Sequence, residues 1–393
     1  MLRKLLFSPA RGALPEKTMD HGFWQRVLSS PLVCLALLFV PSLVAVTQAN
    51  ALANTLYDPL ASALARSLDK LAILPTPFAE ILGGDYGVVA MIPFLLLYAL
   101  PTIVFFSLLI MLYTSTGLMD RIAYGTHPYV RPFGLGARDL TRVVMGFGCN
   151  VPAVVSTWSC SSCSRATCVS AISFGSACSY QLPATLAVFA AAGMTWLGGI
   201  YLLVLGVASL VYLRFSTPKS LREANSRLLP PTLDGLRPPN WKYVFSETLD
   251  TIRSFFAVAI PIFVAICIVA SVLQLAGALA FVSESIGGFM ILFNLPAEAA
   301  VAVAMGSVRK DGMAIGLLDS EWNSLKVVLE SPSQVLTAVF LAGVLLPCLV
   351  TLMTIGREMG VRFAARLALR QVGWAAGFSI TIAWGGALFE TVF

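Results

Sequence analysis

Charged residues and histidine are scarce in this sequence of 393 residues. Only 12% of the residues are charged and two are histidines, whereas 58% are hydrophobic and the mean hydropathy is +0.83. Soluble globular domains carry about 25% charged residues. The composition therefore excludes an ordinary soluble protein and predicts an integral membrane protein.

Motifs for phosphate binding and for catalysis are also missing from these residues. No G-x-x-x-x-G-K-[ST] sequence occurs and no lysine follows a glycine, so a phosphate-binding loop of that type is absent. No neighbourhood combines a nucleophile, a base and an orienting acid, and we expect the chain not to be an enzyme. The net charge of +6 comes from scattered basic residues, which argues against nucleic-acid binding.

A cleavable signal peptide is not expected either, because the apolar core at residues 1–7 is too short. Basic residues gather before the first apolar run and again between Arg214 and Arg253. Under the positive-inside rule both segments lie in the cytoplasm. We expect a multi-pass protein of the cell inner membrane with a cytoplasmic N-terminus.

Long apolar windows predict the membrane-spanning segments. A spanning helix needs about 20 apolar residues, and the windows lie at 33–46, 88–113, 196–213, 257–279, 336–355 and 372–388. We expect an all-α polytopic membrane protein with about eight transmembrane spans, counting broken ones. The predicted parts are a cytoplasmic or interfacial lead-in (1–30), a first membrane half (31–213), a cytoplasmic linker (214–245) and a weakly similar second half (246–393).

Two short motifs interrupt the apolar runs of the first half, GFGCNVPA at 146–153 and CSYQLP at 178–183. Lipid cannot satisfy freed backbone groups, so broken helices persist only inside protein or along a polar cavity. The carbonyls before Cys149 should favour a cation, and a helix should restart at Pro152. The predicted pathway residues of this half are Gly146, Gly148, Cys149, Asn150, Pro152, Cys178 and Pro183.

The second half contains similar interruptions, with a counterpart break expected after Gly306, in GSVRKDG at 306–312, and another in LPC at 346–348. The functional interpretation gives Arg309, Asp311 and Pro347 a gating or structural role. The alternative is that residues 309–311 form a helix end at the cytoplasmic surface.

Eight cysteines occur, and five of them fall between residues 149 and 178, which favours local chemistry over a disulfide framework. A thiolate with an amide oxygen suits a borderline divalent metal such as Fe(II) better than Mg(II) or Ca(II). The predicted metal ligands are Cys149, Asn150, Cys178 and Cys348, with Cys160, Cys163 and Cys168 as secondary candidates. The single C-x-x-C also suits a redox pair, and each buried thiol suits plain packing.

In this order the motifs resemble the membrane part of the ferrous iron transport protein B family, FeoB. The matching stretches are GLMDR (117–121), GFGCNVPA (146–153), CSYQLP (178–183), RKDGMAIGL (309–317), PC (347–348) and REMG (357–360). The resemblance implies two Gate regions, at about 143–194 and 287–356, that form an Fe(II) path. Cys149 and Cys348 would be its pathway thiols, with Cys178 and Asn150 close by.

Two departures from the family pattern stand out. Thr157-Trp158 occupies the place of a Thr-Arg pair, and Tyr180-Gln181 occupies the place of Ala-Arg. The GTP-binding G domain of the family does not occur in this sequence. We therefore expect a separate G-domain protein, or transport driven by a gradient alone.

The resulting expectation is inward transport of Fe(II) through thiol-lined Gate helices, with no permanently bound cofactor. The expected partners are membrane lipid, Fe(II), and a separate G-domain protein or a small cytoplasmic accessory protein, and homo-oligomerisation stays open. One alternative is a transporter for another divalent metal or a nucleoside-like solute. Another is a non-transporting membrane subunit that senses redox state through its C-x-x-C.

Overall fold

The structure is a computed structural model of the chain. It describes residues 73–84, 88–89, 100–136, 139–160, 164–178, 181–220, 222, 236–254, 256–257, 260–277, 285–310, 312–318, 325 and 327–392, with isolated positions between 30 and 60.

Helices make up nearly all of the regular structure in these residues, beside one isolated bridge between Leu318 and Leu325. The predicted all-α class is confirmed. The α-helices are α3 (Thr76–Gly83), α5 (Leu100–Thr116), α6 (Leu118–Val130), α7 (Asp139–Met145), α8 (Asn150–Ser156), α9 (Arg165–Gly175), α10 (Gln181–Ala191), α11 (Leu197–Ser216), α13 (Trp241–Ser254), α14 (Ile260–Leu275), α16 (Ala299–Val308), α17 (Gly312–Leu317), α18 (Pro332–Val344), α19 (Leu349–Met359) and α20 (Val361–Val392). Short 3-10 turns are η3 (Arg131–Phe133), η4 (Thr157–Ser159) and η6 (Gly288–Phe293).

Within the described ranges, 3 helical stretches are long and apolar enough to cross a bilayer: α11, α18 with α19 (Pro332–Met359), and α20. They coincide with the predicted windows at 196–213, 336–355 and 372–388. The window at 257–279 contains the shorter α14, most of the described part of the window at 88–113 lies in α5, and the window at 33–46 is described only at isolated positions. The 32 residues of α20 extend about 48 Å, longer than a hydrocarbon core of about 30 Å.

The two faces of α11 have different surroundings although both are apolar. Tyr201, Leu205 and Tyr212 recur at helical spacing and are buried against protein. Leu203 and Val207 lie on the opposite side and are exposed. An apolar face without protein cover is what a lipid-facing helix presents, so α11 lies at the edge of the helical bundle.

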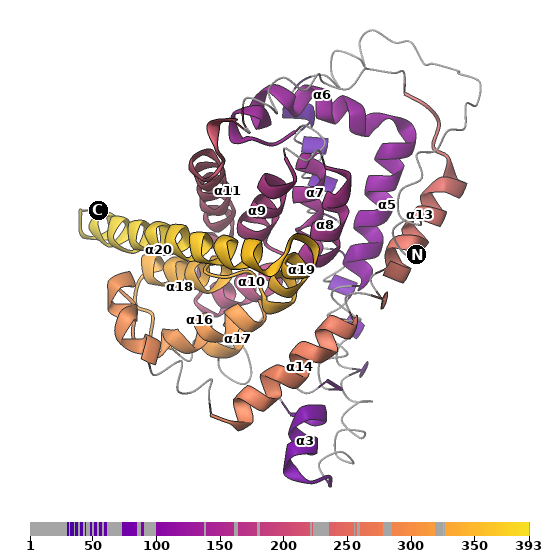
Figure 1. The fold of residues 1–393 in the computed structure, drawn as a ribbon. Coiled ribbons are helices and arrows are strands. Elements are labelled where there is room, and N and C mark those ends of the chain that lie inside the picture. The colour runs from indigo at the N-terminus through magenta and orange to yellow at the C-terminus, as the bar shows by residue number, and fades with distance from the viewer. Residues whose placement is uncertain are drawn as a thin grey trace.

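The most enclosed helix is α18. Ser331 caps its N-terminus by accepting a hydrogen bond from the Gln334 backbone, Pro332 occupies the first turn, and all residues from 335 to 344 are buried. Both α16 and α20 pack against it, and Figure 1 shows the long α20 lying beside α18 and α19. Gly306 of α16 allows this approach, because a Cβ there would lie 2.8 Å from the Ala342 carbonyl oxygen.

Four interruptions divide the helices around this core into short pairs. Break 1 (residues 146–149) separates α7 from α8, and break 2 (176–178) follows α9 before α10 begins. Break 3 (309–310) follows α16 before α17, and break 4 (345–348) separates α18 from α19. Break 3 lies within the predicted stretch 306–312, and α16 continues two residues past Gly306, to Val308. In Figure 1 the short helices gather in the middle of the molecule, with α5, α13 and α14 along one side.

Candidate functional site

The first break is a tight turn that ends in an extended residue. The Gly146 backbone N–H donates to the Arg142 and Val143 carbonyls at the end of α7, at 3.2 and 3.1 Å. Cys149 then adopts φ −155° and ψ 130° immediately before α8. The carbonyls of residues 142–145 all accept hydrogen bonds from the turn, and the expectation that the carbonyls before Cys149 favour a cation stays a prediction.

An acceptor that is available at this break is the side chain of Asn150, the first residue of α8. Asn150 is 3% exposed, and its Oδ1 is buried without a hydrogen-bond partner among the described residues. A buried polar group without a partner costs about 1–3 kcal/mol. An oxygen of this kind beside a thiol is a candidate ligand for a cation, as the sequence predicted.

Three thiols from three breaks lie near one another. Cys149 of break 1 is within electrostatic reach of Cys178 in break 2 and Cys348 in break 4, and none of the three forms a disulfide. They are not gathered into one cage, since among the described residues they form no set with all ligand atoms within 4.8 Å. The arrangement suits successive positions along a path better than one closed site.

Breaks 1 and 2 touch directly. The Ser176 hydroxyl donates to the Val143 carbonyl at 2.8 Å. A Cβ on Gly146 would lie 2.5 Å from the same hydroxyl oxygen, so only glycine fits this approach. The predicted Pro152 and Pro183 lie within the first turns of α8 and α10, and Gly148 belongs to the turn of break 1.

Breaks 3 and 4 are joined by Lys310, a residue that was not among the predicted site residues. Lys310 is 4% exposed, and its ammonium donates to the carbonyls of Gly343, at 2.6 Å, and Leu346. The carbonyl end of a helix favours a cation, and here the ammonium of the chain itself lies at the end of α18. Lys310 is also within electrostatic reach of Cys178 and Cys348.

The alternative that residues 309–311 form a surface helix end is wrong for the described part, because Arg309 is only 9% exposed and Lys310 is still more buried. Asp311 lies outside the described residues. The sequence did contain a signal for Lys310. A lysine between two stretches of small apolar residues is expected to be buried, and a buried charge needs a partner.

Gln181 begins α10 and contacts both α11 and α18. Its amide donates to the Tyr201 hydroxyl at 2.6 Å and is 3% exposed. A Cβ on Gly343 would lie 2.6 Å from the same amide nitrogen. Where the resembling family has arginine, this chain thus places a neutral side chain against Gly343, the residue whose carbonyl accepts from Lys310. Pro347 lies in break 4 directly before Cys348.

The other departure from the family pattern, Trp158, is part of a contact between the two halves. The Trp158 indole N–H donates to the Glu358 carboxylate at the end of α19. The Arg165 guanidinium lies 4.1 Å from the Trp158 ring centroid and 3.4 Å from the same carboxylate. Arg165 therefore supplies a guanidinium beside the position where the family has arginine.

This three-residue contact is expected to couple energetically. In a double-mutant cycle, Trp158→Phe and Glu358→Gln should show a coupling energy of about 0.5–1 kcal/mol, modest because the pair is partly exposed. Unfolding of the protein in detergent measures it. Asp250→Asn, which breaks the exposed Arg253–Asp250 pair on α13, is the matched control and should change stability little. Additive effects of the two substitutions would contradict a coupled contact.

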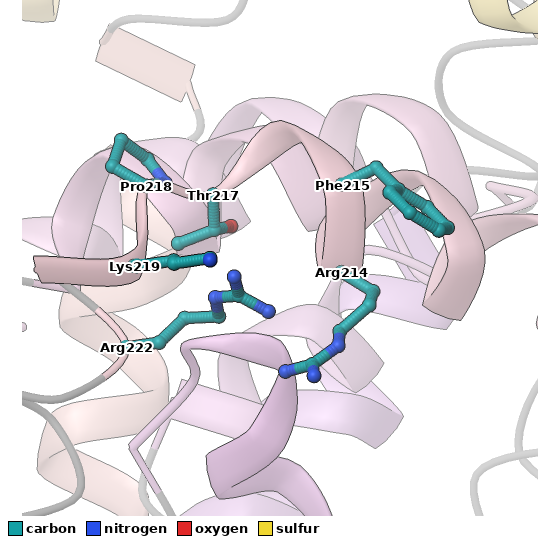
Figure 2. A pocket seen from close by; sticks show the side chains of 6 residues that line it. All are labelled: Arg214, Phe215, Thr217, Pro218, Lys219 and Arg222. Carbon is teal, nitrogen blue, oxygen red and sulfur yellow. The ribbon is translucent and has the colours of Figure 1, made fainter.

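A basic pocket of about 440 Å³ lies elsewhere, at the C-terminal end of α11 (Figure 2). Its lining residues are Arg214, Phe215, Thr217, Pro218, Lys219 and Arg222. Figure 2 shows the nitrogen ends of Lys219 and Arg222 turned toward each other below Thr217. The concentration of positive charge disfavours a metal cation, so this pocket is not part of a cation path.

Comparison with protein families finds one model, described as Gate, nucleoside recognition. It matches residues 96–193 and 256–362. The two matched segments include all four breaks, with Cys149 and Cys178 in the first and Cys348 in the second.

Two similar proteins carry the name Fe(2+) transporter FeoB. The protein from Methanocaldococcus jannaschii is 27% identical over 293 residues, covering 67% of this chain and 44% of that protein. The protein from Campylobacter jejuni is 31% identical over 168 residues, covering 40% of this chain and 26% of that protein. The chain thus spans less than half the length of either relative. No solved structure matches significantly.

Proposed function

From the premise that this chain belongs to the Gate (nucleoside recognition) family, as a protein of the FeoB Gate-region type, we propose that it transports Fe(II) across the cell inner membrane into the cytoplasm. Its apolar helices and its relatives make it a multi-pass membrane protein of transporter type. The proposed path runs through the four breaks, and the N-terminus is proposed to be cytoplasmic.

One observation supports Fe(II) as the transported ion. Thiols and a buried oxygen without a partner in the described structure lie near one another at the breaks. Cys149, Cys178 and Cys348 offer sulfur, and Asn150 offers a buried oxygen without a partner in the described structure. Sulfur with amide oxygen favours a borderline cation such as Fe(II) over Mg(II) or Ca(II). Because the thiols do not form a closed cage, an ion can bind at one position and leave for the next.

The ammonium of Lys310 gives this path a built-in electrostatic control. It lies at the carbonyl end of α18 and within reach of two of the thiols. A mobile cation near Cys178 or Cys348 meets a fixed positive charge, which weakens binding there and favours release. Rapid passage requires sites that bind without trapping the ion.

The family description supports one further candidate, a nucleoside-like solute. The breaks also contain hydrogen-bonding groups suited to a neutral polar solute, such as the Asn150 side chain and the Gln181–Tyr201 pair. Such a solute would not need the thiols. Competition of uridine or adenosine with Fe(II) uptake, compared with competition by Mn(II), Zn(II) and Co(II), separates the two candidates.

Reconstituted vesicles provide the direct test. We expect vesicles containing the protein to accumulate radioactive Fe(II) under reducing conditions several-fold faster than empty vesicles. Parallel assays with GTP and a candidate G-domain protein show whether uptake requires the separate partner that we propose. Uptake no faster than in empty vesicles, in every arm, would refute Fe(II) transport.

A further inference from the structure

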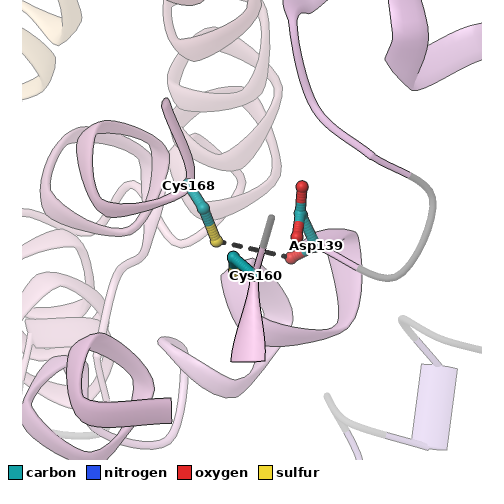
Figure 3. Close-up of side chains that lie close together, drawn as sticks. All are labelled: Asp139, Cys160 and Cys168. Carbon is teal, nitrogen blue, oxygen red and sulfur yellow. Dashed lines mark hydrogen bonds between the residues drawn. The ribbon is translucent and has the colours of Figure 1, made fainter. Parts of the chain in front are cut away.

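A second group of metal-binding side chains lies at the base of the α7–α8 hairpin, away from the four breaks. Asp139 begins α7, Cys160 follows η4, and Cys168 lies in α9. Their ligand atoms all lie within 4.8 Å of one another, and Figure 3 shows the three side chains converging. In the part of the chain that the structure describes, no other group of three such residues is this close.

The cluster is enclosed and its position is well defined. Asp139 is 4% exposed and Cys168 is fully buried, whereas Cys160 is partly buried. The Cys168 sulfur donates to the Asp139 carbonyl at 3.8 Å, the contact drawn in Figure 3. Both thiols are free. Other buried cysteines, such as Cys267 on α14, belong to no such group, so burial alone does not account for the convergence.

A divalent cation bound by two thiolates would leave the charge at this place balanced. The Asp139 carboxylate accepts a hydrogen bond from the Gly136 backbone at 2.8 Å and lies 3.5 Å from Arg142. Arg142 therefore balances the carboxylate. Two thiolates would then be balanced by one divalent cation, which leaves the enclosed cluster neutral, as buried charges require.

The distances also suit coordination. Ligand atoms about 2.3 Å from a tetrahedral metal lie roughly 3.8 Å apart. Atoms within 4.8 Å of one another reach that spacing through small side-chain rotations. The site is separate from the breaks, because α7 has 7 residues and extends about 10 Å between Asp139 and break 1.

We propose that Asp139, Cys160 and Cys168 form a second metal site, which binds a borderline divalent cation through two thiolates and one carboxylate. Each thiol gives its proton to solvent when the metal binds, and no oxidation state changes. Two sulfur ligands select Fe(II), Co(II) or Zn(II) over Mg(II) and Ca(II). The Cys160–Cys168 pair, and not the Cys160-x-x-Cys163 spacing by itself, defines the site.

Co(II) binding to the purified full chain tests the proposal without a transport assay. The background is Cys149→Ser/Cys178→Ser/Cys348→Ser, which removes the thiols of the breaks. In detergent with a non-thiol reductant, we expect one Co(II) per chain, near-ultraviolet absorption from thiolate coordination, and displacement of Co(II) by Zn(II). Adding Cys168→Ser or Cys160→Ser should weaken binding at least tenfold, while adding Cys267→Ser should leave it unchanged.

Asp139→Asn keeps the shape of the carboxylate and should weaken Co(II) binding while the thiolate absorption remains. Protection from alkylation gives a second readout, in which Zn(II) should shield Cys160 and Cys168 but not Cys267 after brief partial unfolding. The proposal is overturned if the background variant shows no thiolate absorption with Co(II), or if Cys168→Ser and Cys160→Ser both bind as the background does. Isolation of a Cys160–Cys168 disulfide together with no Co(II) binding after reduction would identify a redox pair instead.

The outcome is independent of the proposed transport function. If the parent chain shows no Fe(II) uptake but the background variant binds Co(II), transport is refuted and the second site remains. If the parent chain takes up Fe(II) but the background variant binds no Co(II), the second site is refuted and transport remains.

Discussion

Serine in place of Cys149 is expected to reduce Fe(II) uptake by roughly tenfold to a hundredfold, the range found when groups that support a metal site are removed. The substitution keeps the size of the side chain and the extended backbone before α8, so the helix break should persist. It removes the sulfur that lies within electrostatic reach of Cys178 and Cys348. Radioactive Fe(II) uptake into reconstituted vesicles measures the loss.

The matched control is Cys267→Ser, which exchanges a buried thiol on α14 outside the four breaks. Its uptake should equal that of the parent. Equal uptake by Cys149→Ser and the parent would remove the central thiol from the proposed mechanism. If uridine but not Co(II) competes in that case, the nucleoside-like solute becomes the better proposal.

Methionine in place of Lys310 is expected to cause the largest loss of stability. The ammonium satisfies the buried carbonyls of Gly343 and Leu346, and methionine keeps the length of the side chain without any donor. A buried acceptor left without a partner costs about 1–3 kcal/mol. Thermal or denaturant unfolding of the purified protein in detergent should therefore shift clearly toward lower stability.

Lys219→Met is the matched control, because Lys219 is an exposed lysine at the basic pocket and its loss should change stability by less than about 0.5 kcal/mol. Lys310→Arg tests the charge, since arginine keeps the positive charge and the donors, and it should recover part of the loss. If Lys310→Met is as stable as Lys219→Met, then the ammonium does not hold breaks 3 and 4 together.

The contact between the halves and the proposed second metal site both involve the segment that joins α8 to α9 and the helix α9 itself. Trp158 and Cys160 both follow α8, and Arg165 and Cys168 both lie in α9. A metal bound to Cys160 and Cys168 would therefore fix the segment that also contacts Glu358 of α19. Their tests are different. The contact between the halves is measured as a coupling energy between substitutions at Trp158 and Glu358, and the metal site is measured by the absorption of bound Co(II).

The sequence by itself determined the class of protein and the places where its helices break. A long apolar stretch is stable in lipid only as a helix, because lipid cannot satisfy free backbone groups. The all-α membrane class and the span of α11 could therefore be predicted from composition and apolar length. Proline, glycine and serine act on their own backbone, which is why breaks 1 and 4 could be predicted in the stretches 146–153 and 346–348. Break 3 also lies within its predicted stretch, 306–312, and only packing decides that α16 continues past Gly306 to Val308.

Only the tertiary structure decided which groups meet. Lys310 reaches the carbonyls of Gly343 and Leu346, and Asp139 meets Cys160 and Cys168, across separations that no local pattern encodes. The carbonyls of α7 are taken by the turn that follows them, while Asn150 retains a buried oxygen without a partner in the described structure. Burial and hydrogen-bond pairing depend on neighbours distant in sequence, and these neighbours determine which of the predicted groups remain available to bind an ion.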